Sequence, residues 1–594
     1  MRKASRFLFA LLVTLPALIM SGFLQAAQTL EKVSDFSLID HNGKILELSR
    51  QRFNKALVIF AHGDQCDSSS ADLAALRRVR DNWQERAVNV VMMNSIANES
   101  REDIIKAVER SDIEFRVLDD SSQLVAEALG LTQAGQVVVV DPSTKAIHYR
   151  GPLGATVERT LEDLLAGKSK ATVNINTTSG CDIAFRAKQM HEQKVPDYST
   201  VIAPLVEKNC AYCHREGGIG PFAMNSHIML KGFAPMIKEV LLTKRMPPMQ
   251  VDPHVNSFTN ANYMSDQELQ TFVHWIDAGA PRGKGKVDPL TAIAHGDLRA
   301  WQLGEPDHIV VAPEHDIPAT GVLDYYNEVV ELSFDEDKWV KAVQFIPGDP
   351  AVLHHLLTYV VAPSEEFQPG RRVAQGVDIG EAAAVPQPGR NVASGLNSRK
   401  FLEGYAPGKV DAMVFPENTG VFVPKGHNLA MQFHYTTNGK ATKDKTILGI
   451  YFHDEKTLPV DEYLNLAVAT PFKIPANAIE HNVVAKHTFA EPITLYGLRA
   501  HMHFRGRDMK FSLEYPEGEL VDVLNVADYS YAWQPTYQLE KPMYIPAGAT
   551  MYVTGSFDNS QYNPANPDPN KEVTFGLQSW DEMYIGYLSY TKAK

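Results

Sequence analysis

The pentapeptide Cys210-Ala211-Tyr212-Cys213-His214 constrains this chain more than any other feature of its sequence. Covalent attachment of a haem c needs two thiols, which add across the vinyl groups, and a neighbouring histidine that binds the iron. The chain has only 4 Cys and 20 His among 594 residues, so the odds of this run arising by chance are on the order of one in a thousand. A redox C-x-x-C pair and half of a zinc site are less favoured. We therefore predict that Cys210, Cys213 and His214 hold a haem c.

The sixth ligand of this haem is expected to be a methionine, because a thioether ligand raises the potential of the iron. Met246 is preferred, since Pro247 and Pro248 follow it and would stiffen the loop that carries it. Residues 244–248 resemble the R-M-P-P-W motif of cytochrome c domains, although Met249 stands where those domains have tryptophan. The other candidates are Met224, Met229, Met236, Met249 and Met264.

Residues 1–27 have the pattern of a secretory signal peptide. Three basic residues within the first six precede an apolar run over 7–23, and the small residues Ala26 and Ala27 follow. An uncleaved membrane anchor is the alternative. No later segment offers about 18 unbroken apolar residues, so we expect a periplasmic or secreted protein without stable membrane insertion of the mature chain. The net charge of −14 argues against nucleic acid as a partner.

Hydrophobic patterning predicts a multi-domain chain that begins with an α/β domain over residues 28–180. Two short apolar runs, 57–60 and 137–140, are bounded by turn residues and are typical of buried strands. Between them, residues 69–83 and 101–111 have helical spacing. This βαβ pattern implies a parallel or mixed sheet.

A small all-α cytochrome c domain and two all-β domains are expected to follow. Residues 190–285 look helical; Ser265 and Glu268 form a capping box, and Gly279 and Pro281 end the helix that it starts. Residues 286–304 are predicted to be a linker. Short strands between Gly, Pro and Asn turns over 305–460 and 461–594 predict two jelly-roll-like β-sandwiches in series.

Histidines gather at three places in this all-β half: the pair at 354–355, the single residue at 434, and the H-x-H pattern at 501–503. Residues i and i+2 of a strand point to one face, so His501 and His503 can bind one metal. His354 and His355 can share an ion only if the chain bends there or sits at a strand end. Imidazole sets suit copper, zinc or iron, and an added thioether favours Cu(I). Four further histidines are expected to be structural or surface residues: His427, His453, His481 and His487.

Residues 305–594 resemble the copper type II, ascorbate-dependent monooxygenases, the family of peptidylglycine α-hydroxylating monooxygenase and dopamine β-monooxygenase, and above all their bacterial relatives. The segments that carry the resemblance are H-M-H at 501–503, D-N-S at 558–560, N-P-A-N-P-D-P at 563–569 and D-E-M at 581–583. Unlike the animal enzymes, which have several disulfides, residues 215–594 contain no cysteine. Arg499 and Ala500 replace the usual pair before H-M-H, which leaves substrate specificity open.

The resemblance implies two copper ions and a set of site residues. An electron-transfer copper would be held by His354, His355 and His434, with Gln432 near it. A second copper, which binds O2 and substrate, would be held by His501, His503 and Met583. Tyr587 and Arg499 would line the substrate site, where Arg499 could pair with a substrate carboxylate.

Residues 30–180 resemble the thioredoxin-fold redoxins related to peroxiredoxins. Cys66 follows the first buried strand, where that family has its nucleophilic thiol, but Ser69 occupies the second position of the C-x-x-C. Ala134 and Gly135 replace the expected threonine and cis-proline. A structural or docking role is therefore preferred over dithiol exchange, and a Cys66–Cys181 disulfide is a further alternative.

These features together predict a copper-dependent monooxygenase that hydroxylates a C–H bond of a small-molecule or peptide substrate with O2. The fused haem c domain would supply single electrons, received from ascorbate or a periplasmic redox protein. One alternative is a non-catalytic haem and copper protein for electron transfer or copper handling. Another is a peroxide or thiol reductase centred on the redoxin region, which the missing second cysteine disfavours.

Overall fold

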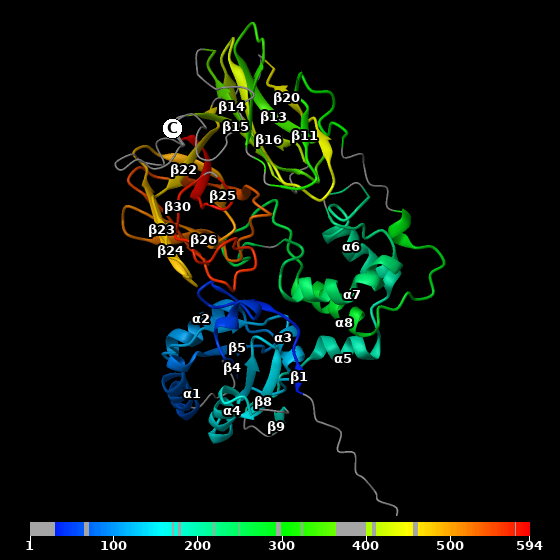
Figure 1. Cartoon of the computed structure of the whole chain (residues 1–594), viewed down its shortest axis with the longest axis vertical. Helices are drawn as coiled ribbons and strands as arrows, with labels where there is room; N and C mark the ends of the chain where they lie inside the picture. Colours follow the sequence, from blue (N-terminus) through cyan, green and yellow to red (C-terminus); the bar gives the residue numbers. More distant parts are fainter. Residues whose placement is uncertain are drawn as a thin grey trace, which may run out of the picture.

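A computed structural model describes most of the chain, arranged as an N-terminal α/β unit, a helical segment and two β-sandwiches (Figure 1). The described residues are 30–63, 70–168, 172–175, 180–216, 218, 220–248, 250–292, 299–321, 323, 325–363, 399–406, 411–454, 461–576 and 578–593. The predicted signal peptide, Cys66, Ser69 and Met249 lie outside them. Within this part of the chain, no helix is long and apolar enough to cross a membrane.

The N-terminal unit is built on a mixed sheet with the strand order β1-β8-β7-β4-β5-β6, and β9 pairs with β8. The strands are β1 (Glu31–Lys32), β4 (Ala56–His62), β5 (Val88–Asn94), β6 (Val117–Asp119), β7 (Gln136–Asp141), β8 (Ala146–Pro152) and β9 (Val173–Asn174). The helices are η1 (Ser49–Phe53), α1 (Ser70–Trp83), η2 (Gln84–Arg86), α2 (Arg101–Arg110), α3 (Leu124–Leu129) and α4 (Ala155–Leu165). Every residue of β4 is buried, because apolar clusters cover both faces of the sheet. The predicted α/β fold is confirmed.

The middle of the chain is helical. Its elements are α5 (Arg186–Gln193), the π-helix η3 (Tyr198–Ile202), α6 (Ala203–Asn209), α7 (His227–Leu242), α8 (Asp266–Asp277) and η4 (Pro289–Ala292). The capping box forms as predicted, with Ser265 accepting from the Glu268 N–H and Glu268 accepting from the Ser265 N–H. The segment Cys210-Ala211-Tyr212-Cys213-His214 is the turn that directly follows α6.

Two β-sandwiches form the rest of the chain, as predicted. The first packs the sheet β10-β20-β13-β17-β21, with β16 beside β13, on the sheet β12-β18-β14-β15; the second packs β22-β31-β25-β28 on β24-β29-β26-β27. The first sandwich contains β10 (His308–Val311), β11 (His315–Ile317), β12 (Tyr326–Glu331), β13 (Lys338–Ile346), β14 (Leu353–Val361), β15 (Lys400–Tyr405), β16 (Met413–Val414), β17 (Thr419–Val423), β18 (Asn428–Tyr435), β19 (Thr442–Asp444), β20 (Ile447–Phe452) and β21 (Asp461–Glu462). The second contains β22 (Leu464–Ala469), β23 (Lys473–Ile474), β24 (His481–Thr488), β25 (Ile493–Met502), β26 (Gly506–Glu514), β27 (Leu520–Val526), β28 (Tyr537–Ile545), β29 (Thr550–Phe557), β30 (Val573–Thr574) and β31 (Tyr584–Lys592). Each has an apolar core, and the core of the second sandwich includes Val251 and Phe258 of the segment between α7 and α8.

A hairpin of the N-terminal unit docks on the second sandwich, which lies beside it in Figure 1. The hairpin joins β2 (Ser37–Ile39) to β3 (Ile45–Glu47). At its turn, Lys44 Nζ lies 2.6 Å from Asp508 Oδ1, and the Asn525 side chain donates to the Gly43 carbonyl at 2.8 Å. Close by, Arg101 pairs with the fully buried Asp252 at 2.5 Å. The N-terminal unit is thus held by polar contacts to the second sandwich and to Asp252 of the segment between α7 and α8, and the Arg101–Asp252 pair is buried.

Gly43→Ala should open this docking contact. Gly43 has φ of +79°, and a Cβ there would meet Asn525 Nδ2 at 2.6 Å, so alanine brings both strain and a clash. We expect deuterium uptake at residues 40–44 and 523–527 to rise about tenfold, which corresponds to about 1.4 kcal/mol. Gly135→Ala is the matched control: φ is +81°, but the added Cβ would meet nothing within 4 Å. Equal uptake at 523–527 in both variants would contradict the docking role of Gly43.

Candidate metal centres

Three histidines of the first sandwich converge at one end of the two central strands of its β12-β18-β14-β15 sheet. His354 and His355 begin β14, and His434 lies opposite them on β18. The register between these strands shifts between Leu353 and His355, and this irregularity lets two adjacent histidines face one point. The Nδ1 atoms of His354 and His355 lie 3.1 Å apart, and the ligand atoms of all three rings lie within 4.8 Å of one another.

The surroundings of this first cluster keep its imidazoles neutral. Burial lowers the pKa of His354 to about 4 and that of His434 to about 3. Burial and the neighbouring histidines hold the pKa of His355 well below its usual value. The Tyr325 ring stacks on His434 at 4.7 Å. The buried His434 Nδ1 has no hydrogen-bond partner among the described residues. Neutral rings with a buried, unsatisfied nitrogen fit the ligands that a copper or zinc ion requires.

A second cluster forms where β25 ends and β31 begins. His501 Nε2 lies 3.2 Å from Met583 Sδ, and the His501 and His503 ring centroids lie 5.4 Å apart. Metal–nitrogen and metal–sulfur bonds of about 2.1 and 2.3 Å at a near-tetrahedral angle would separate the two ligand atoms by about 3.5 Å. The observed spacing therefore fits one shared ion.

Hydrogen bonds to the Nδ1 atoms orient the two imidazole rings of the second cluster. His501 Nδ1 donates to Gln534 Oε1 at 2.7 Å, and His503 Nδ1 donates to the Asp581 carbonyl at 3.3 Å. Each bond places the proton on Nδ1, which leaves Nε2 free to bind a metal. Burial lowers the pKa of His501 to about 4 and holds that of His503 well below its usual value.

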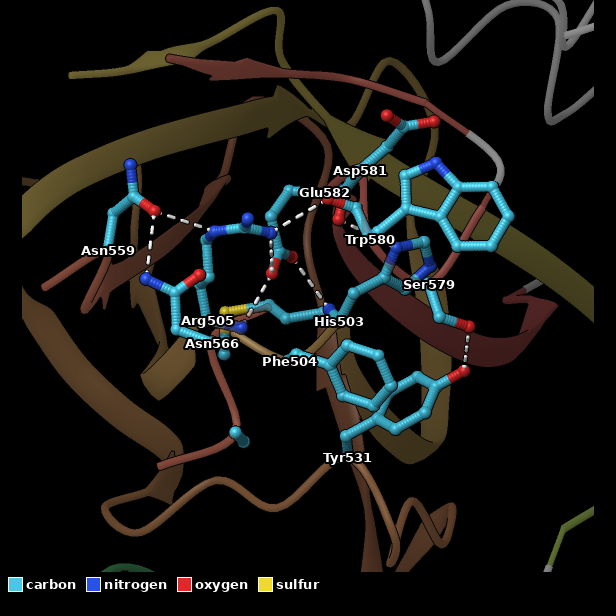
Figure 2. Close-up of polar contacts among 12 residues, drawn as sticks. His503, Phe504, Arg505, Tyr531, Asn559, Asn566, Ser579, Trp580, Asp581 and Glu582 are labelled. Atoms are coloured by element: carbon cyan, nitrogen blue, oxygen red, sulfur yellow. Dashed lines mark hydrogen bonds and ion pairs between the residues drawn. The ribbon is translucent and has the colours of Figure 1, made fainter. Parts of the chain in front are cut away.

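A buried polar network supports the backbone of this cluster (Figure 2). Glu582 accepts the His503 N–H at 2.8 Å and the Arg505 N–H at 2.6 Å. The Arg505 side chain donates to Asn559 Oδ1 at 2.8 Å and to the Trp580 carbonyl at 2.9 Å. Both Glu582 and Arg505 are fully buried. Burial raises the pKa of Glu582 to about 8, although the two N–H donors oppose that shift.

Comparison with known proteins agrees with the chemistry of this second cluster. Residues 474–594 match the family model of the copper type II ascorbate-dependent monooxygenase C-terminal domain. Copper-dependent oxidoreductase chemistry is thereby supported for the sandwich that holds His501, His503 and Met583. Residues 29–151 match the AhpC/TSA family, which supports the thioredoxin-like fold of the N-terminal unit.

Solved structures match the chain over about a quarter of its length. A hypothetical protein from Sinorhizobium meliloti is 22% identical, with 26% of this chain and 93% of that chain covered and a TM-score of 0.23. A thiol-disulfide oxidoreductase from Bacteroides fragilis is 19% identical, with 23% and 99% covered and a TM-score of 0.21. No curated protein matches the chain.

The other predicted site residues of the copper-monooxygenase half lie near the clusters. Arg499 pairs across strands with Tyr587, and its guanidinium lies 4.5 Å from the Tyr587 ring and 5.6 Å from that of Phe401. The Tyr587 ring is 6.3 Å from His501. Gln432 lies two residues before His434 but donates to Asn327 at 3.1 Å.

Sequence patterns missed several residues that contact the clusters. Tyr325 precedes β12, and Gln534 and Tyr531 lie in the connection between β27 and β28. None has a regular spacing from a histidine, because each reaches its cluster through tertiary packing. Gln534 follows a Y-A-W run, and no residue in that run signals a metal site.

The C-A-Y-C-H turn presents its reactive groups as free side chains. Cys210 and Cys213 are free thiols, and His214 Nδ1 donates to the Phe222 carbonyl at 3.0 Å, which directs Nε2 away as a ligand. A Cβ on Gly220 would meet His214 Nδ1 at 2.7 Å. Met246 is 40% exposed, and burial raises the pKa of Cys210 to about 12. A thiol of that kind suits dithiol exchange poorly.

Residues 181–183 are hydrogen-bonded to the loop before β7 of the N-terminal unit. Cys181 is disulfide-bonded. The Ala134 N–H donates to the Cys181 carbonyl at 2.9 Å, and the Ile183 N–H donates to the Thr132 carbonyl at 2.8 Å. Residues 181–183 therefore pair with the loop that contains Ala134 and Gly135, where the redoxin family has its threonine and cis-proline.

Metal-free protein should lose stability as the pH falls from about 6.5 to about 4. The unfolded-state pKa of histidine is about 6.5, whereas folding lowers that of His354 and His501 to about 4. The unfolded state therefore binds more protons in this window, so the free energy of unfolding falls as the pH falls. Urea unfolding at several pH values measures the slope, which should be shallower in His501→Gln. A flat profile between pH 6.5 and 4 would contradict the assignment of these rings as buried and neutral.

Proposed function

We propose that this chain is an exported copper monooxygenase that hydroxylates a C–H bond of a small-molecule or peptide substrate with O2. The observation that carries the proposal is the assembly of two separate ligand sets, each neutral and convergent, one of them within the matched copper-monooxygenase domain. When bound, copper would supply one-electron redox chemistry and activation of O2.

The side chains divide the work between two sites. His354, His355 and His434 would hold the electron-transfer copper, and His501, His503 and Met583 the copper of the oxygen site. Gln534 and the Asp581 carbonyl orient the two imidazoles of the oxygen site. Arg499, stacked on Tyr587 beside His501, would bind an anionic group of the substrate and so position the C–H bond.

A haem c held by Cys210, Cys213, His214 and Met246 would accept electrons from the donor and pass them to the electron-transfer copper. This assignment is supported by two cysteines of one turn that form no disulfide and by His214, whose Nδ1 is already bonded to a carbonyl. The turn also contacts the first sandwich directly, because the Tyr212 hydroxyl donates to Asp411 at 2.8 Å. A haem attached at this turn would thus be carried against the sandwich that holds the electron-transfer site. Ascorbate or a periplasmic redox protein would be the donor.

Met246→Ala tests whether Met246 is the sixth ligand of the proposed haem. If Met246 is the sixth ligand, its loss should abolish the spectrum of a methionine-ligated haem and lower the reduction potential. Absorption spectroscopy and redox titration of the purified protein measure both. Met236→Ala, at a half-exposed position of α7, is the matched control and should leave the spectrum unchanged. An unchanged spectrum in Met246→Ala would assign the ligand to another methionine.

Copper content and oxygen uptake together test the enzyme proposal. We expect two copper ions per chain and O2 consumption that depends on a reductant and on an organic substrate. Two bound coppers without O2 reduction under any donor would overturn the enzyme proposal and support the alternative, a non-catalytic haem and copper protein. One copper in the purified, copper-loaded chain would contradict one of the two assigned sites, and none would contradict both.

A further inference from the structure

Tyr531 lies between the two histidine clusters, although it belongs to neither. It sits in the connection between β27 and β28 of the second sandwich. Its ring stacks on His354 of the first sandwich, with centroids 4.5 Å apart and planes at 21°. The same ring meets His503 edge-on at 5.8 Å and 80°. One side chain therefore touches a ligand of each predicted metal site.

The second sandwich holds this ring from two sides (Figure 2). The Tyr531 hydroxyl is hydrogen-bonded to Ser579 Oγ at 2.7 Å, and Phe504 packs edge-on against the ring at 4.7 Å. Ser579 precedes the D-E-M segment, and Phe504 follows His503 directly. The Tyr531 ring is thus anchored to residues that flank the second cluster. One face of the ring stacks on His354 of the first cluster.

The two clusters are close enough to influence each other. The His354 and His503 rings can be no farther apart than the sum of their distances to the Tyr531 ring. Arg499 of the second sandwich also lies over Phe401 of the first, so the sandwiches are in contact beside the clusters.

We propose that Tyr531 is a positioning residue that clamps the two metal clusters face to face and sets the distance between them. This inference rests on the proposed function, because it assigns a metal to each cluster. The ring fills the space between His354 and His503, and its stacking energy opposes separation of the sandwiches. The hydrogen bond from the Tyr531 hydroxyl to Ser579 orients the ring. The ring itself makes the contact with the first sandwich.

Electron paramagnetic resonance of the fully oxidised, two-copper protein tests the clamp. Dipolar broadening between two Cu(II) ions falls steeply with distance, so it reports their separation independently of turnover. Tyr531→Ala should bind two coppers but show narrow lines of isolated ions, and Tyr531→Phe should retain the broadening. Tyr544→Ala, at an exposed tyrosine of β28, is the control for tyrosine loss elsewhere in the same sandwich. Unchanged broadening in Tyr531→Ala with two coppers bound would overturn the inference.

Hydrogen exchange of the metal-free full-length chain separates this inference from the proposed function. A clamp predicts that Tyr531→Ala raises deuterium uptake at residues 353–356 of the first sandwich as well as at 529–534, and that Tyr531→Phe does not. A merely local structural role would raise uptake at 529–534 alone, and that result would refute the clamp. Tyr531→Leu, which keeps apolar bulk without a stacking face, should behave like the alanine variant and guards against an unfolded Tyr531→Ala. A wild-type chain that fails to bind two coppers would instead count against the proposed function.

Discussion

His434→Ala is expected to lower the copper content from two ions per chain to one and to reduce substrate hydroxylation by more than about 100-fold. His434 is the only ligand of the first cluster on β18, and its buried Nδ1 has no hydrogen-bond partner in the described part of the chain. Its removal leaves His354 and His355 as an incomplete set. The second cluster, built from β25 and the segment before β31, should still bind its ion.

Copper analysis and single-turnover kinetics check this result. His501→Ala should also leave one copper, but at the other site, so the two variants should give different Cu(II) spectra. His427→Ala, in the same sandwich at the start of the β18 region, should keep both ions. Retention of two coppers and full activity in His434→Ala would remove the first site from the proposal.

The sequence alone predicted the parts of the fold that depend on local periodicity. The buried β4, the helix α1 and the capping box at Ser265 formed because their patterns are local, and the H-x-H spacing put His501 and His503 on one face. The adjacent pair His354-His355 needed a bend, which the irregular register at the start of β14 provides. Such a bulge depends on the partner strand. The sequence therefore showed only that the pair needs a bend or a strand end in order to bind one ion.

Residues that join separate elements could not be predicted. Tyr531, Gln534 and the Tyr212–Asp411 contact link segments that lie far apart in the sequence. Met583 was predicted as a ligand only from the resemblance of its D-E-M segment to the monooxygenase family. No spacing rule connects it to His501, 82 residues away. These positions depend on how the two sandwiches and the helical segment pack, which a pattern along one chain does not encode.

Glu582→Ala should cost about 3–5 kcal/mol of stability and weaken copper binding at the second site. Glu582 is fully buried and accepts the N–H groups of His503 and Arg505. Alanine would leave both N–H groups without an acceptor, at about 1–3 kcal/mol each, and would remove the only described acid paired with the Arg505 guanidinium. The His503 backbone would then shift, which should lower copper affinity about 10–100-fold.

Glu582→Gln distinguishes the acceptor role from mere packing. Glutamine has the same shape and keeps one oxygen acceptor, so it should lose only about 1–2 kcal/mol and most of the copper affinity should remain. Urea unfolding of the metal-free chain and copper titration of each variant measure the two effects. Arg505→Met combined with Glu582→Ala should cost less than the sum of the single variants, because each removes the partner that the other leaves unpaired. A Glu582→Ala protein as stable as the wild type, with copper bound equally tightly, would show that the network does not support His503.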